Sequence, residues 1–446
     1  MKVSFVSLGC DKNLSDSETM LGLLLEKGYE VTEDETEADA VVINSCCFIH
    51  DAKQESVNTI LEFADMKTEG KLKAIIVAGC LSQRYCDEIL EEIPEVDACI
   101  GTNGIAEIVD VLERVLNGEK VRRVSDINAE LPRIKARAVT TGGHFAYLKI
   151  AEGCDKCCTY CIIPKIRGKY RSLPMDFLIE QAEYLVNDVG VKELILVAQE
   201  TTVYGTDLYG HKALPELLKK LCRIDGLEWI RILYCYPEEV TEELLDVMRS
   251  EPKICHYLDI PIQHASDSVL KRMGRRTTRQ ELIDKINLIR DKMPDVVLRT
   301  TLITGFPGET EEDHEILLDF VDEMEFDRLG VFTYSREEDT PAAEMPGQID
   351  EDVKNARRDS IMELQQEIAF EHTESRVGQR MLAFVEGYLP EDNIYVARTY
   401  MDAPSVDGYL FFTSDRELMS GDFVPVRITG SNEYDLIGEL DNEYSQ

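Results

Sequence analysis

Three cysteines, Cys154, Cys158 and Cys161, stand in a C-x3-C-x2-C spacing within one short loop. Such a loop can wrap three thiolates around a cubane [4Fe–4S] cluster. Because three thiolates leave one iron without a protein ligand, that iron stays open to a small molecule. Cys157 leaves a second pairing open, since the same loop also contains two C-x2-C pairs of the zinc-binding type. Zinc pairs are normally separated by a longer loop, so the spacing favours the iron–sulfur cluster.

Three further cysteines each come directly after a strand-like run in the N-terminal part of the chain. The cysteines are Cys10, Cys46 and Cys80, and the runs before them span 3–8, 40–45 and 73–79. In a doubly wound sheet, ligands gather outside the carboxyl ends of the strands, so the three thiols should converge. One such cysteine would more often be a small packing residue. Three of them predict a second cluster, with Cys47 as the neighbour that competes with Cys46.

The elements that must hold these cysteines alternate between strands and helices over residues 1–120. A fourth strand is expected at 96–101, and helices are expected near 16–27, 50–66, 83–92 and 104–116. This alternation predicts a parallel, doubly wound sheet. A polar, basic stretch at 121–143 with a Gly-Gly pair is expected to be a linker.

Residues 144–375 repeat the alternation and predict a second domain. Its expected strands span 145–150, 193–198, 229–234, 257–262, 296–303 and 328–334, and a closing helix spans about 352–375. Six βα units predict an open or partial barrel related to the eight-stranded TIM barrel, with chemistry at the carboxyl ends of the strands. The loop with Cys154, Cys158 and Cys161 follows the first of these strands, which agrees with a catalytic role.

The last part of the chain, 376–446, changes to short strand-like runs between turn residues. These runs span 381–389, 394–400, 408–413, 423–429 and 434–440. They predict a small all-β barrel of about OB size. The expected fold class is α/β multidomain: a doubly wound parallel sheet, a partial (βα)6 TIM-like barrel and an OB-like barrel.

Composition favours a cytoplasmic enzyme. A hydrophobic content of 44% and a charged content of 30% are those of a globular protein. No apolar run reaches the roughly 20 residues of a membrane helix, and the N-terminus lacks the pattern of a signal peptide. Thirteen cysteines in such a chain indicate metal binding or reactivity rather than a disulfide framework. The net charge of −38 repels nucleic-acid phosphate and attracts basic proteins.

The loop at 152–161 resembles the cluster loop of the radical S-adenosylmethionine (SAM) superfamily. This resemblance identifies Cys154, Cys158 and Cys161 as the ligands of its cluster. It implies that the open iron binds the amino and carboxylate groups of SAM. Tyr160 matches the aromatic position of the superfamily that lies near the adenine.

The whole chain is similar to the methylthiotransferase family, in its RimO-type branch. The segments that carry the similarity are 7–18 (SLGCDKNLSDSE), 44–49 (NSCCFI) and 77–85 (VAGCLSQRY). Thr and Gly are more usual where Ser45 and Cys47 stand, but the ligand position at Cys46 is intact. The resemblance implies a second [4Fe–4S] cluster on Cys10, Cys46 and Cys80, and a C-terminal TRAM domain.

The two clusters have different roles in the implied reaction. Replacing hydrogen on an unactivated carbon requires a radical, which a cofactor must supply. By resemblance, the first cluster cleaves SAM reductively to a 5′-deoxyadenosyl radical, and the auxiliary cluster provides sulfur that a second SAM methylates. The RimO-type branch acts on the β-carbon of one aspartate in small-subunit ribosomal protein twelve. A flavodoxin- or ferredoxin-type electron donor and a sulfur source are further expected partners.

Other strand ends of the barrel are expected to contact SAM. Gln199, Glu200 and Thr201 follow the second strand and match the Gln-Asp-Thr of the family, with Glu in place of Asp. Gln263 follows the fourth strand. Gly305 follows the fifth, where a glycine allows close approach of the backbone to the nucleoside. We expect these residues to bind the cofactor.

Two other functions stay open at this point. A tRNA methylthiotransferase (MiaB-type) has the same clusters and acts on isopentenyl-adenosine, and an OB-like barrel could belong to a non-enzymatic RNA-binding iron–sulfur protein. Residues 373–446 contain five Arg, no Lys and 14 Asp or Glu, which is a net charge of −9. This charge argues against tRNA and for a basic ribosomal protein. The candidate substrate-binding residues are Glu433, Asp435 and Glu439, which flank the last strand of the barrel.

Overall fold

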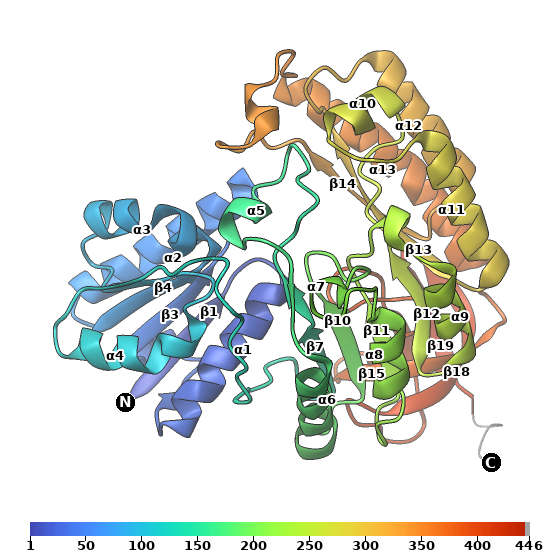
Figure 1. The fold of residues 1–446 in the computed structure, drawn as a ribbon. Helices are drawn as coiled ribbons and strands as arrows, with labels where there is room; N and C mark the ends of the chain where they lie inside the picture. Colours follow the sequence, from blue (N-terminus) through green and yellow to red (C-terminus); the bar gives the residue numbers. More distant parts are fainter. Residues whose placement is uncertain (442–446) are drawn as a thin grey trace.

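The computed structural model describes residues 1–441, which form two α/β parts and a C-terminal β-barrel (Figure 1). Residues 442–446, the end of the predicted third domain, lie outside the described residues. Among residues 1–441, no helix is both long and apolar enough to cross a membrane.

Six parallel strands form the N-terminal sheet, in the order β2-β1-β3-β4-β5-β6. They are β1 (Lys2–Ser7), β2 (Glu30–Val31), β3 (Ala40–Ser45), β4 (Ala74–Gly79), β5 (Ala98–Ile100) and β6 (Val121–Arg123). The helices are α1 (Asp11–Glu26), α2 (His50–Thr68), α3 (Cys80–Glu92) and α4 (Ile108–Leu116). Every residue of β3 and β4 is buried because helices cover both faces. The predicted doubly wound parallel sheet is confirmed.

Several boundaries in this region differ from the prediction, and helix α4 begins at Ile108 rather than 104. Helix α1 begins at Asp11 rather than near 16, because its first turns bury polar side chains that hide the amphipathic pattern. Helix α3 begins at Cys80 rather than 83. Strand β6 lies within the stretch predicted as a linker, where its backbone pairs with β5.

The central part contains an open sheet of six parallel strands, in the order β14-β13-β12-β11-β10-β7. The strands are β7 (Phe145–Lys149), β10 (Glu193–Val197), β11 (Trp229–Ile232), β12 (Ile254–Asp259), β13 (Val297–Thr304) and β14 (Arg328–Thr333), beside a two-stranded ribbon of β8 (Ala151–Glu152) and β9 (Arg171–Ser172). The helices are α5 (Ile163–Ile166), α6 (Met175–Tyr184), α7 (Thr206–Tyr209), α8 (Leu214–Leu221), α9 (Glu242–Ser250), α10 (Asp267–Arg272), α11 (Arg279–Lys292), α12 (Glu311–Met324) and α13 (Glu351–Glu374). β7 and β14 are free edges, so the predicted partial barrel is confirmed.

The C-terminal barrel is closed and packs against one face of the central sheet. Its strands are β15 (Arg380–Leu389), β16 (Ile394–Arg398), β17 (Leu410–Thr413), β18 (Phe423–Asn432) and β19 (Asp435–Leu440). The two parts share one apolar core, in which the rings of Trp229 and Phe384 lie 5.7 Å apart. Arg398 of the barrel also pairs with Glu193 of β10 at 2.7 Å, with both side chains fully buried. These contacts fix the barrel on the sheet.

Candidate functional site

Cys10, Cys46 and Cys80 lie at the carboxyl ends of three neighbouring strands. Because β1, β3 and β4 are adjacent and parallel, the residues that follow them emerge at one edge of the sheet. Gly9 has a φ of +89°, and a Cβ there would lie 2.6 Å from the Cys46 Cβ, so glycine lets these two loops approach. The structure brings the three predicted cysteines together.

Asn13, a residue that the sequence patterns did not single out, links the three cysteine loops. Its side-chain amide donates to the carbonyl oxygens of Leu8 at 3.0 Å and Ser45 at 3.1 Å. Its Oδ1 lies 3.9 Å from the Cys80 Sγ. Because Asn13 is fully buried, these bonds hold the spacing of the loops in the protein alone.

Burial favours the protonated form of two thiols in this group, Cys46 and Cys80. Burial and the neighbouring thiols of Cys80 and Cys10 raise the pKa of Cys46 to about 12. Burial also raises the pKa of Cys80. A thiolate is the form that binds metal, and a bound metal cation displaces the proton. Three convergent thiols, two buried and one half-buried, are therefore suited to hold a metal cluster.

Cys154, Cys158 and Cys161 form the second group, in the loop after β8. Burial and the Cys158 thiol raise the pKa of Cys154 to about 12. Burial also raises the pKa of Cys161, and the thiols of Cys158 and Cys154 raise it further. The three cysteines are buried or half-buried, whereas Cys157 is exposed. This difference favours the frame of three ligands over two zinc-type pairs.

Backbone contacts fix the shape of this second loop. Gly153 has a φ of +81°, and a Cβ there would lie 2.1 Å from a carbonyl oxygen of the segment after α5. The Cys154 N–H donates to the Gly168 carbonyl oxygen at 3.1 Å. The Cys158 Sγ lies 2.6 Å from the Tyr236 hydroxyl, so the segment that follows β11 also supports the loop.

Within residues 1–441, no three His, Cys, Asp or Glu side chains are close enough to hold a single metal ion. A [4Fe–4S] cluster spreads its thiolate ligands over several irons, so its ligands lie further apart than those of one ion. The two groups fit such a cluster by the chemistry and number of their donors.

Gln199 and Glu200 lie beside the second cysteine group. The Gln199 amide donates to Glu152 at 2.6 Å and accepts from the Gly153 N–H at 2.9 Å, which ties β10 to the cysteine loop. Glu200 is 1% exposed, and its Oε2 has no hydrogen-bond partner among the described residues. Burial raises the pKa of Glu200 to about 7. The Oε2 of Glu200 lies 3.8 Å from the Lys156 Nζ, too far for a hydrogen bond, so it can accept one from a polar group of a ligand.

Thr201, Gln263 and Gly305 have roles within the fold. The Thr201 hydroxyl donates to the Leu233 carbonyl oxygen at 2.8 Å. Gln263 has a φ of +72° and forms a bridge to β13. A Cβ at Gly305 would lie 2.1 Å from the Lys354 Cγ, so the glycine lets α13 approach the sheet. Each of these three residues therefore has a structural role that does not depend on a cofactor.

Tyr160 and Arg275 lie close to the second cysteine group. Tyr160 is half-buried, and burial together with the Cys158 thiol raises the pKa of its hydroxyl. The Arg275 guanidinium lies 4.0 Å from the Tyr236 ring centroid. Its Nε and Nη1 have no hydrogen-bond partner in the described part of the chain. Sequence patterns missed Arg275, because it lies in a turn after α10 with no recognisable spacing to the cysteines.

The acidic residues proposed to bind the substrate lie far from both cysteine groups. They are Glu433, Asp435 and Glu439. The backbone carbonyl oxygen of Glu433 accepts a hydrogen bond from the hydroxyl of Thr373, near the end of α13, at 3.0 Å. Lys354, near the start of α13, packs against Gly305. At 1.5 Å per residue these two contacts are about 28 Å apart along the helix, so the structure does not bring the acids to the cysteines.

A buried ionic cluster lies between the two cysteine groups. Arg167 donates to Asp16 and Glu152, both at 2.9 Å, and Lys149 pairs with the same two carboxylates. All four residues are buried or half-buried, at the contact of the N-terminal and central parts. In the sequence, Arg167 is one of two charged residues in the largely apolar run after Cys161, and nothing there marks it as buried.

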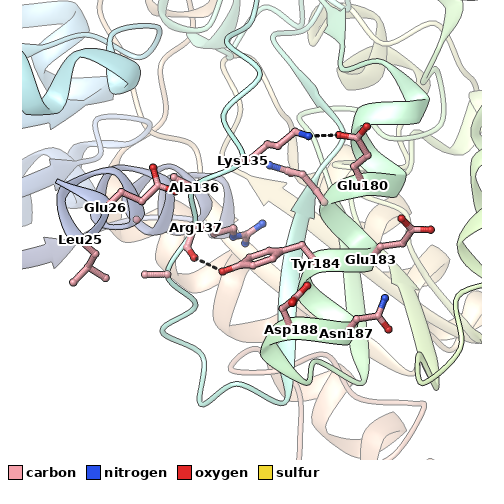
Figure 2. A pocket seen from close by; sticks show the side chains of 13 residues that line it. Leu25, Glu26, Lys135, Ala136, Arg137, Glu180, Glu183, Tyr184, Asn187 and Asp188 are labelled. Carbon is pink, nitrogen blue, oxygen red and sulfur yellow. Dashed lines mark hydrogen bonds and ion pairs between the residues drawn. The ribbon is translucent and has the colours of Figure 1, made fainter. Parts of the chain in front are cut away.

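A cleft of about 700 Å³ lies elsewhere, between the last turn of α1 and α6 (Figure 2). Lys135 and Glu180 form an ion pair at 2.7 Å across it, and the Tyr184 hydroxyl donates to the Arg137 carbonyl oxygen at 3.4 Å. Since α1 starts beside Cys10 and is roughly 24 Å long, this cleft is remote from the cysteines. It contains none of the predicted site residues.

Comparisons with protein families agree with this architecture. Residues 2–101 match the family described as "Uncharacterized protein family UPF0004", residues 148–321 match the radical SAM superfamily, and residues 377–440 match the TRAM domain. The solved radical S-adenosylmethionine methyltransferase TsrM from Kitasatospora setae is similar in fold, with a TM-score of 0.56, 13% identity, and coverage of 86% of this chain and 81% of that chain. The fold and the cysteine loop therefore define a radical SAM enzyme with a TRAM domain.

Relatives that match over nearly the whole chain identify the family within this superfamily. The chain is 63% identical to the ribosomal protein uS12 methylthiotransferase RimO of Lachnoclostridium phytofermentans, over 98% of this chain and 99% of the relative. It is 49% identical to the protein of that name from Clostridioides difficile, over 99% of both. The chain belongs to the RimO family of radical SAM methylthiotransferases, which confirms the branch predicted from its first cysteine motif.

Proposed function

We propose that this chain attaches a methylthio group to the β-carbon of an aspartate in ribosomal protein uS12. The observation that carries the proposal is the presence of two groups of three thiols on either side of one domain interface, in a member of this family. The proposed ligands are Cys154, Cys158 and Cys161 for the SAM-binding [4Fe–4S] cluster, and Cys10, Cys46 and Cys80 for the auxiliary one.

When bound, the two clusters and SAM would supply the radical and the sulfur that side chains cannot provide. The residues of the chain bind and orient these groups. Glu200 offers a buried carboxyl oxygen, Tyr160 offers an aromatic surface, and Gln199 holds the cysteine loop against β10. Thr201, Gln263 and Gly305 complete the proposed SAM site by shaping the backbone around it.

The reaction also requires partners that donate electrons and sulfur. We infer a flavodoxin- or ferredoxin-type electron donor, a separate sulfur source, and action in the cytoplasm on a basic ribosomal protein. The net charge of −38 supports such a substrate, because it speeds the association of the chain with a basic protein and slows its association with tRNA.

A competition experiment tests the acceptor. Reconstituted enzyme is incubated with uS12 and with tRNA that carries isopentenyl-adenosine, and each is examined by mass spectrometry for the methylthio mass shift. We expect the shift on one aspartate of uS12 and none on the tRNA. Modification of the tRNA alone would favour the MiaB-type alternative.

Replacing Glu200 by Gln should stabilise the protein at pH 8 but not at pH 5. The folded state keeps the proton of Glu200 up to about pH 7, whereas the unfolded chain releases it near pH 4.5. Stability is therefore lost as the pH rises between these values, by about 3 kcal/mol in total. Thermal unfolding at the two pH values measures the effect as a difference in Tm.

Glu239→Gln is the matched control for this prediction. Despite burial, the ammonium groups of Lys156 and Lys212 hold the pKa of Glu239 below its usual value. Its replacement should lower Tm at pH 8, which is the opposite sign. Equal Tm changes in both variants would contradict the interpretation of Glu200 as a carboxyl whose pKa is raised by burial.

Reversing the charge of the barrel acids should raise the KM for uS12 severalfold and leave SAM cleavage in the absence of uS12 unchanged. The change is Glu433→Lys, Asp435→Lys and Glu439→Lys, on the barrel beside the C-terminal end of α13. Long-range attraction of a basic protein weakens when acidic charge is lost. Steady-state kinetics at two salt concentrations measures the change in KM. Salt screens the charges, so the difference in KM between the variant and the unmodified chain should be smaller at high salt.

A second triple variant on the same barrel controls for net charge. Glu391, Asp392 and Glu417 are exposed, and their reversal changes the total charge by the same amount. If both triple variants have the same KM, the attraction is a property of the whole molecule. The predicted substrate site at Glu433, Asp435 and Glu439 would then be wrong.

A further inference from the structure

The short helix α5 joins the radical SAM loop to the N-terminal part of the molecule. It begins two residues after Cys161 and lies beside α3 (Figure 1). Ile162 and Ile166 belong to the same apolar core as Cys80, and they are 2% and 1% exposed. The Ile166 carbonyl oxygen also accepts the hydroxyl of Thr102 at 3.1 Å. The segment that follows one cysteine group is therefore embedded in the domain that carries the other.

Arg167 ends α5, and its side chain contacts the first cysteine group directly. Its Nη2 donates to the Cys80 Sγ at 3.4 Å and to the Asn13 Oδ1. Its Nη1 donates to Asp16 and Glu152, so the guanidinium is held on both sides. Arg167 is 2% exposed, which excludes water from the contact with sulfur.

The backbone next to Arg167 contacts the second cysteine group. The carbonyl oxygen of Gly168 accepts the Cys154 N–H at 3.1 Å. Glu152, which Arg167 holds, lies two residues before Cys154. Two consecutive residues thus contact ligands of both proposed clusters. Arg167 contacts Cys80 through its side chain, and Gly168 contacts Cys154 through its backbone.

We infer that Arg167 is a positioning residue that fixes the two cluster sites relative to each other and raises the reduction potential of the auxiliary cluster. The inference rests on the proposed cluster ligands. Hydrogen bonds to sulfur and nearby positive charge stabilise the reduced, more negative form of an iron–sulfur cluster. Arg167 provides both at Cys80, from a site where low dielectric strengthens them.

The auxiliary cluster can be studied alone in a chain that carries Cys154→Ala, Cys158→Ala and Cys161→Ala. In this background, Arg167→Met removes the donor and the charge, and Arg167→Lys keeps the charge without the fork. Lys149 still pairs with both Asp16 and Glu152, so each carboxylate keeps a cationic partner. The measurements are iron content and the midpoint potential by EPR-monitored redox titration.

We expect the midpoint potential to be highest with Arg167 present, lower in Arg167→Lys and lowest in Arg167→Met. All three proteins should contain about four irons per chain. Arg137→Met is the matched control, because Arg137 is also a buried arginine, pairs with Glu18 at 2.7 Å and forms no hydrogen bond to a cysteine among the described residues. Its potential should equal that of the background. An unchanged potential in Arg167→Met with full iron would overturn the inference. Absence of iron from the background itself would overturn the proposed ligands instead.

Discussion

Replacing Cys154, Cys158 and Cys161 together by Ala should lower the iron content from about eight to about four per chain and abolish cleavage of SAM. These thiols are the proposed cluster ligands of the loop, and the open iron of their cluster is the proposed site at which SAM binds. Iron analysis after anaerobic reconstitution and chromatographic detection of 5′-deoxyadenosine measure the two effects.

Cys157→Ala provides the control for this variant. Cys157 lies in the same loop but is exposed, so its loss should leave both iron content and SAM cleavage close to those of the unmodified chain. A triple variant that keeps all its iron would show that the three cysteines are not cluster ligands. A zinc-type pairing would instead make Cys157→Ala as harmful as Cys158→Ala.

Replacing Cys10, Cys46 and Cys80 by Ala should have a different result: 5′-deoxyadenosine still forms, and the methylthio product disappears. The reason is spatial, because these thiols lie at the edge of the N-terminal sheet and the SAM loop keeps its own three ligands. Mass spectrometry of uS12 and analysis of 5′-deoxyadenosine in the same reaction measure both outcomes. Methylthiolated uS12 from this variant would contradict the role of the auxiliary cluster in supplying sulfur.

Cys47→Ala is the corresponding control. Cys47 is adjacent to Cys46 but fully buried in the apolar core on one face of the sheet. Its loss should reduce stability slightly and leave most of the activity. If Cys47→Ala removed the product while Cys46→Ala did not, the ligand position would belong to Cys47.

The sequence alone determined the elements and the cysteines at their ends. Strands and helices follow from local hydrophobic periodicity, and β3 was predicted with its observed bounds, 40–45. In parallel sheets all strands end at one edge, so Cys10, Cys46 and Cys80 could be placed together from their positions after β1, β3 and β4. The cluster loop was recognisable because its three ligands lie within eight residues of one another.

The tertiary structure decided how the parts are joined, because interdomain contacts leave no periodic pattern. Arg167, Asp16 and Glu152 read as ordinary charged residues in sequence, and only folding removes them from water and pairs them. The position of Glu433 in space likewise depends on packing, because its backbone carbonyl oxygen contacts Thr373 at the C-terminal end of α13. Local patterns fix where a side chain lies on its own strand or helix, whereas the distance between two sites depends on how whole domains pack.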